Sequence, residues 1–184
     1  MKITLRILLF LACAAFARGA TFELGVHGTL SVTVPETWVA RGRDLGGKAF
    51  DLTFQPKSDA NAQCKLTLIY PDKPMAIDKE RIKKDIQGAA QKFVAGSVEK
   101  KAVLKEFKLK RGYGAYCSFT DESLVGKPPI RGNYKTMTSG FVGLSEDVTG
   151  AVTLLSDSFA SQEFKTMLSI VESLEIRRSD SKKL

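Results

Sequence analysis

The chain has 184 residues, of which 43% are hydrophobic and 26% charged, as expected for one globular domain. Its net charge is +8, but a chain that begins at Thr21 carries 25 basic and 20 acidic residues, so the excess falls to +5. Such a mild excess is typical of an ordinary solvated surface, with an acidic partner or an anionic membrane surface as the alternative. A single histidine, His27, and no cysteines at paired-ligand spacing argue against a metal site.

The first twenty residues have the pattern of a secretory signal. Lys2 and Arg6 give a basic start, residues 7–15 form an apolar run, and Ala17 and Ala20 offer small residues for cleavage. The sequence therefore predicts a signal peptide at residues 1–20, a single mature domain at residues 21–184, and a periplasmic or secreted location.

A lipid anchor is the alternative fate of this segment. Phe10-Leu11-Ala12-Cys13 resembles a degraded lipoprotein signal, in which Cys13 would be acylated and become the new N-terminus. The apolar run is too short to cross a bilayer, which needs about 20 residues, so no transmembrane segment is predicted.

Alternation of apolar and polar residues predicts four strands in the first part of the mature chain. They are expected at residues 22–28, 29–35, 49–54 and 64–70. The first two read as a hairpin around Gly25 and Gly28. Trp38 follows Pro35 in a turn, where its ring is expected to close one edge of the core.

Two helices and further strands are predicted downstream. Asp78 caps a helix that runs to about Ala95, and Ser161 opens a second one. Strands are expected at residues 98–110, 115–120, 134–144 and 148–155. Arg177 and Arg178 belong to an expected frayed basic tail. Because strands outnumber helices and mostly follow one another through short turns, we expect an α+β fold: a mainly antiparallel sheet flanked by helices, an α/β/α sandwich.

Cys64 and Cys117 remain after removal of the signal, and two interpretations are open. Each cysteine alternates in phase with the apolar residues of its predicted strand, so its side chain should point to the same face as theirs. Both side chains are therefore expected in one core, where a disulfide would close a long loop. The alternative is that each is a free cysteine packed as a small hydrophobe.

The longest irregular segment, residues 121–133, is the candidate partner-binding loop. It carries the apolar residues Leu124, Val125 and Ile130 beside Lys127 and Arg131, and two prolines limit its freedom. One expectation is that these apolar side chains are exposed for a partner. The other is that the loop folds back and buries them itself.

Several segments together resemble the PsbP-like, Mog-type fold family and its bacterial DcrB-like relatives, which are exported proteins of unassigned role. The features are Val32-Thr-Val-Pro35 with Trp38 after it, Phe50-Asp-Leu-Thr-Phe-Gln-Pro56, Val152-Thr-Leu-Leu-Ser-Asp157 and the closing stretch at residues 164–174. The resemblance implies an antiparallel sheet between helices, used as a non-catalytic binding or assembly module. It transfers no site residue.

No pattern in the chain indicates an enzyme or a bound cofactor. His27 is the sole histidine that could serve as a base, and it lies in a predicted turn, where an exposed histidine is the simpler interpretation. No nucleophile elbow or phosphate loop occurs. The lysines of residues 100–111 alternate with apolar residues as in a half-buried strand, so nucleic-acid binding is not predicted either.

The expected function is an exported, non-catalytic binding or assembly module of the cell envelope, whose partner the sequence does not name. The alternative is a carrier of a small or lipid-like ligand held between sheet and helix.

Overall fold

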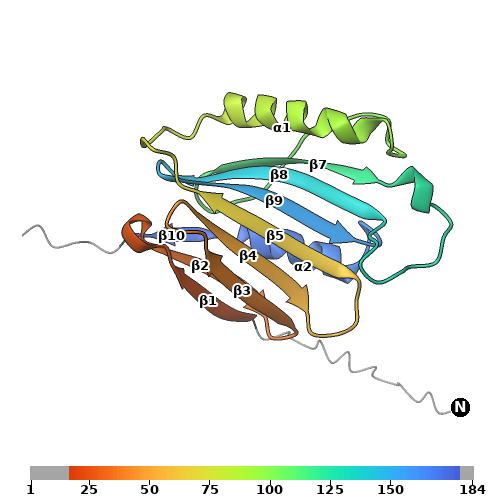
Figure 1. The fold of residues 1–184 in the computed structure, drawn as a ribbon, viewed down its shortest axis with the longest axis horizontal. Helices are drawn as coiled ribbons and strands as arrows, with labels where there is room; N and C mark the ends of the chain where they lie inside the picture. The colour runs from red at the N-terminus through yellow and green to blue at the C-terminus, as the bar shows by residue number, and fades with distance from the viewer. Residues whose placement is uncertain (1–16, 179–184) are drawn as a thin grey trace, which may run out of the picture.

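The structure, a computed structural model, describes residues 17–178 (Figure 1). The predicted signal segment before Ala17 and the candidate acylation site at Cys13 lie outside these residues. The strands are β1 (Ala17–Glu23), β2 (Thr29–Pro35), β3 (Trp38–Asp44), β4 (Ala49–Pro56), β5 (Ala62–Ile69), β6 (Lys105–Glu106), β7 (Tyr113–Thr120), β8 (Thr136–Ser145), β9 (Val148–Ser156) and β10 (Glu175–Arg177). The helices are α1 (Lys79–Val94) and α2 (Gln162–Glu172), with short 3-10 turns η1 (Gly25–His27) and η2 (Glu122–Leu124).

Every pairing between these strands is antiparallel, and the strands form two sheets. The larger sheet has the order β3-β4-β5-β9-β8-β7-β6, and the smaller one has the order β1-β2-β10. The predicted α+β class, with a mainly antiparallel sheet architecture and two helices, is confirmed.

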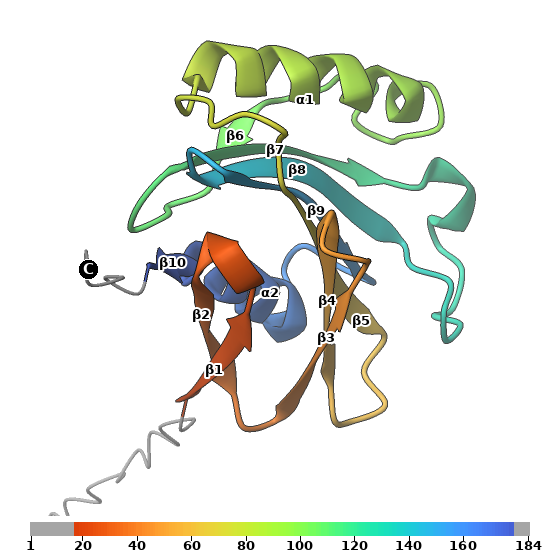
Figure 2. The ribbon, with the colours of Figure 1, turned by 60° about the vertical axis from the view of Figure 1, so that its left-hand side comes forward.

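The two helices pack against different parts of the larger sheet (Figure 2). Helix α1 contacts β7 and β8, whereas α2 contacts β5 and β9 and also reaches β2 of the smaller sheet. In Figure 2 the sheet separates α1 from α2. Each helix begins where the sequence predicts, because Asp78 accepts a hydrogen bond from the backbone of Arg81 and Ser161 from that of Phe164.

Period-two alternation places the main core under α2. On β5, Cys64, Leu66 and Leu68 are buried and alternate with more exposed residues, and they join Met167 and Ile170 of α2 in one cluster. Trp38 is buried in the same cluster, which confirms its expected place in the core.

The structure differs from the sequence prediction at four elements. The first strand covers Ala17–Glu23 rather than residues 22–28, which mostly form the turn with η1. Trp38 begins strand β3 rather than lying in a turn, residues 98–110 are mostly irregular with only the two-residue β6, and Arg177 belongs to β10 rather than to a frayed tail. Beside β10, Gly28 has φ +93 and passes so close to the Arg177 carbonyl that a Cβ would lie 2.5 Å from its oxygen. Only glycine fits there.

Of the two interpretations of Cys64 and Cys117, the structure shows the free cysteines: both are unbridged and buried, and the disulfide is wrong. Cys64 packs in the α2 cluster, but Cys117 packs with Phe119 and with Ile86 of α1. Their strands are separated by β9 and β8, or about 14 Å of sheet, whereas bridged Cα atoms lie within about 7 Å. The alternation pattern predicted one shared core because it does not show that both faces of this sheet bury apolar residues.

We therefore expect two slow-reacting thiols. Burial raises the pKa of both the Cys64 and the Cys117 thiol, which suppresses the reactive thiolate. Iodoacetamide should leave both unlabelled in the native protein and label both in guanidinium chloride without a reductant. A Cys64–Cys117 linked peptide in a non-reducing digest would contradict the structure.

Candidate functional site

The predicted binding loop, residues 121–133, joins β7 to β8 and is held at its start by a cap. The Asp121 carboxylate accepts a hydrogen bond from the backbone N–H of Ser123 (2.8 Å) at η2, and the N–H of Glu122 donates to the Gly96 carbonyl (3.0 Å). Gly96 follows α1, so the beginning of the loop is anchored to the end of that helix.

Asn61, just before β5, holds the other end of the loop. Its side-chain amide donates to the carbonyls of Ile130 (3.3 Å) and Asn133 (3.2 Å). Its carbonyl oxygen accepts from the backbone N–H of Gly132 (2.9 Å). The Asp157 carboxylate lies 2.9 Å from the same nitrogen, so the two amide hydrogens are shared among three acceptors. Because one side chain satisfies three backbone groups, this irregular segment has a defined conformation.

The loop exposes most of its apolar residues instead of burying them. Val125 is 59% exposed and Ile130 is 61% exposed, whereas Leu124 is half-buried. The fold-back expectation is therefore wrong for Val125 and Ile130. Lys127 and Arg131 are also exposed, and Arg131 pairs with Asp59 at 3.0 Å.

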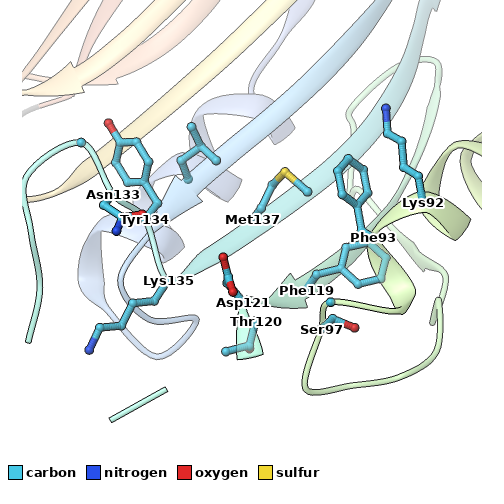
Figure 3. A pocket seen from close by; sticks show the side chains of 13 residues that line it. Lys92, Phe93, Ser97, Phe119, Thr120, Asp121, Asn133, Tyr134, Lys135 and Met137 are labelled. Carbon is cyan, nitrogen blue, oxygen red and sulfur yellow. The ribbon is translucent and has the colours of Figure 1, made fainter. Parts of the chain in front are cut away.

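A groove of about 470 Å³ lies beside this loop (Figure 3). Apolar side chains contribute to its lining from α1, β7 and β8: Phe93, Phe119 and Met137. The Phe93 and Phe119 rings are 5.6 Å apart between centroids and tilted by 44°. Lys92 and Lys135 add two cationic side chains. The groove was not predicted from the sequence, because its residues come from separate elements and meet only where the end of α1 contacts β7 and β8.

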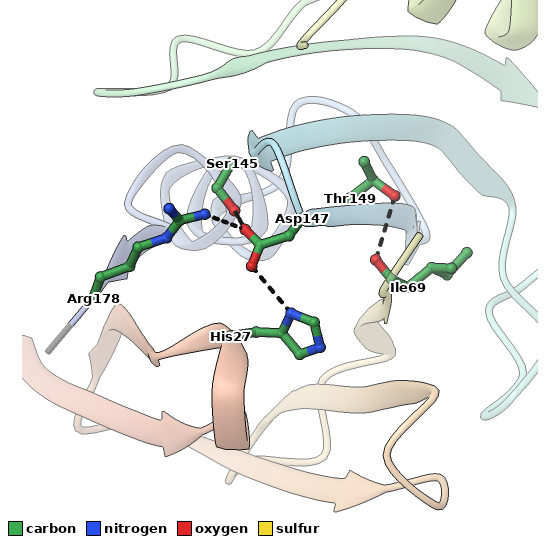
Figure 4. A network of polar contacts seen from close by, with 6 residues as sticks. All are labelled: His27, Ile69, Ser145, Asp147, Thr149 and Arg178. Atoms are coloured by element: carbon green, nitrogen blue, oxygen red, sulfur yellow. Dashed lines mark hydrogen bonds and ion pairs between the residues drawn. The ribbon is translucent and has the colours of Figure 1, made fainter. Parts of the chain in front are cut away.

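A second polar cluster joins the η1 turn to Arg178, the residue after β10 (Figure 4). Asp147, in the β8–β9 turn, accepts hydrogen bonds from Arg178 (2.6 Å) and Ser145 (2.8 Å) and contacts His27 Nδ1 at 3.1 Å. The His27 ring stacks on Tyr70 with centroids 4.0 Å apart. His27 therefore lies in a turn as predicted, but it is half-buried rather than exposed.

The contacts of Asp147 with Ser145, Arg178 and His27, which we call the clasp, have a structural geometry rather than a catalytic one. Ser145 donates to Asp147 rather than to His27, so serine, histidine and carboxylate do not form the nucleophile–base–acid series that hydrolysis requires. Burial alone would raise the pKa of Asp147, but hydrogen bonds from Ser145, Arg178 and His27 and the charge of Arg178 lower it to about 2. The carboxylate thus holds together β9, the η1 turn and the residue after β10.

Residues 17–178 contain no group of three or more histidine, cysteine or acidic side chains placed to hold a metal ion. In the same residues, no helix is both long and apolar enough to cross a membrane. No protein-family model matches the chain, and no curated protein sequence matches it.

The clasp predicts a specific pH dependence of stability. The lowered pKa of Asp147 stabilises the folded state above the ordinary value of 3.8, and this stabilisation is lost as the pH falls toward about 2. Asp147→Asn should lower the free energy of unfolding by about 2 kcal/mol at pH 7, and the difference from wild type should shrink between pH 4 and pH 2.

Urea unfolding at a series of pH values measures this difference. The neighbouring Glu146→Gln is the matched control, because Glu146 is exposed on the same turn, and it should change stability by less than about 0.5 kcal/mol. A loss in Asp147→Asn that is the same at all pH values would contradict the clasp.

Proposed function

We propose that this protein is an exported, non-catalytic binding module of the cell envelope that captures a partner protein through loop 121–133. The observation that carries the proposal is the exposure of Val125 and Ile130 on a loop whose backbone is fixed by Asn61 and Asp121. Apolar side chains on a pre-ordered loop can be buried against a partner with little loss of chain entropy.

The fold is compatible with this role. A mostly antiparallel sheet with one helix packed at β7 and β8 and another at β5 and β9 supports grouping the chain with PsbP-like, Mog-type proteins as an α/β/α sandwich. Well-known members of that group bind or assemble other proteins. We extend that role to this chain on the loop geometry, because the resemblance transfers no site residue.

Export is part of the proposal, and β1 favours one of the two cleavage sites. Ala17 pairs with Pro35 and Ala20 with Val32, so cleavage after Ala20 would remove more than half of β1. We therefore expect cleavage after Ala17 and an N-terminus at Arg18. N-terminal sequencing of the exported protein measures this directly; a chain beginning at Thr21, or an acylated Cys13, would contradict it.

The groove beside the loop supports a second candidate function, carriage of a small amphipathic ligand. Its volume of about 470 Å³ is within the usual range of small-molecule sites, about 300–1,000 Å³. Phe93, Phe119 and Met137 offer apolar contacts, and Lys92 would attract a negatively charged end, whereas the Lys135 ammonium donates to the Lys127 carbonyl. In this alternative the loop is one wall of a ligand site.

Photocrosslinking tests the favoured function. A benzophenone side chain at position 130 should give a discrete adduct in the envelope of the native host, and the same probe at Val26, which is 96% exposed elsewhere on the molecule, should not. With the partner identified and purified, Val125→Ser/Ile130→Ser should weaken its binding by about tenfold or more. The melting temperature should stay within about 2 °C of wild type, because both side chains are already exposed.

Val26→Ser/Leu45→Ser is the matched control, since it also removes two exposed apolar side chains, and it should leave partner binding unchanged. Equal adducts from positions 130 and 26 would contradict the proposed interface. A small molecule retained in a native mass spectrum and lost in Phe93→Ala would favour the carrier function instead.

A further inference from the structure

The positive charge of the chain is concentrated in one segment. Residues 79–111 contain eleven basic and four acidic residues, a net charge of +7. The remaining described residues, 17–78 and 112–178, contain 13 basic and 15 acidic residues, a net charge of −2. The net positive charge of the described residues is therefore small, although it is strongly concentrated in residues 79–111.

The fold gathers this segment at one margin of the larger sheet. Helix α1 contacts β7 and β8, and β6 is the terminal strand of the sheet beside β7. Between them, the backbone N–H groups of Val98 and Phe107 donate to the carbonyls of Thr120 and Gly114. Residues 79–111, which we call the basic layer, thus surround the β7–β6 edge of the larger sheet. The layer runs from α1, which is outermost in Figures 1 and 2, to Lys108, whose backbone N–H donates to Glu172 of α2 (3.0 Å).

Most cations of the basic layer are exposed and form no ion pair within 4 Å. Ten of its eleven basic residues are exposed, the exception being the half-buried Lys83. Among the described residues, ion pairs involve only three of the eleven, which are Arg81, Lys83 and Lys100. The field of the other eight is therefore open to a binding partner.

We propose that the basic layer docks this protein onto the anionic headgroups of a membrane surface. Nine of the eleven cations are lysines, whose mobile point charges suit a diffuse lipid surface better than the bidentate pairing that arginine gives to single carboxylates. Val98 is 50% exposed in the same layer and adds an apolar contact at the headgroup level. Docking through this layer is peripheral and does not depend on the function of loop 121–133.

Vesicle co-sedimentation of the purified mature protein tests this inference. Vesicles of phosphatidylglycerol and phosphatidylcholine in equal parts should retain the protein at low ionic strength, and retention should fall as salt is added. Pure phosphatidylcholine vesicles should not retain it. The layer variant replaces Lys84, Lys101, Lys108 and Lys110 with glutamine, and it should partition onto the anionic vesicles at least about tenfold more weakly.

The matched control replaces Lys48, Lys57, Lys65 and Lys73, four exposed lysines outside the layer, with glutamine. It removes the same net charge, and its partitioning should fall by no more than about twofold. Thermal melts of both variants establish that they are folded. An equal fall in both variants would overturn the inference, because net charge alone would then explain binding. Wild-type protein that binds polyglutamate but not anionic vesicles would also overturn it and would point to an acidic protein.

The loop variant Val125→Ser/Ile130→Ser should bind vesicles as the wild type does, so this test is separate from the loop's function.

Discussion

The pairing of β9 with β5 is the interaction on which the rest of the structure depends. Eight residue pairs, from Ala62–Ser156 to Ile69–Thr149, join strands that are far apart in the sequence, and β8 pairs with the other edge of β9. This insertion places Asp157 beside Asn61 and the β8–β9 turn beside His27. The ordered binding loop and the Asp147 clasp are both consequences of it.

The larger sheet buries apolar residues on both of its faces. The two faces nevertheless differ in how much they bury. The α2 face carries the main core, with Cys64, Leu66 and Leu68 of β5. The other face is covered by α1 only at β7 and β8, where smaller clusters form around Cys117 and Tyr113. Because α1 needs only one apolar face for this contact, its other face is free to carry charge. The start of loop 121–133 is hydrogen-bonded to Gly96 within the basic layer, so the two proposed binding surfaces adjoin one another.

The sequence predicts those features that depend on local chemistry. Asp78 and Ser161 mark the helix starts because a cap involves residues only three positions apart, and alternation marks β2, β4, β5 and β9. Alternation does not show which of two buried faces a residue joins, so the expectation that Cys64 and Cys117 share one core was wrong. Loop 121–133 was predicted from its prolines, but Asn61, the groove around Phe93 and the clasp of Asp147 with Arg178 were not. Each of these arises from contacts between distant segments, for which one sequence contains no signal.

The measurement that tests this account most directly is a nuclear Overhauser spectrum of the free protein in solution. The pairing of β5 with β9 predicts cross-strand contacts between backbone protons of Leu66 and Val152 and of Lys65 and Thr153, which are register partners. A register shifted by one residue would move Leu66 opposite Ala151 or Thr153 and turn the apolar side chains of β9 to the wrong face. Contacts in a shifted register, or none between β5 and β9, would contradict the placement of Asn61, the loop and the clasp together.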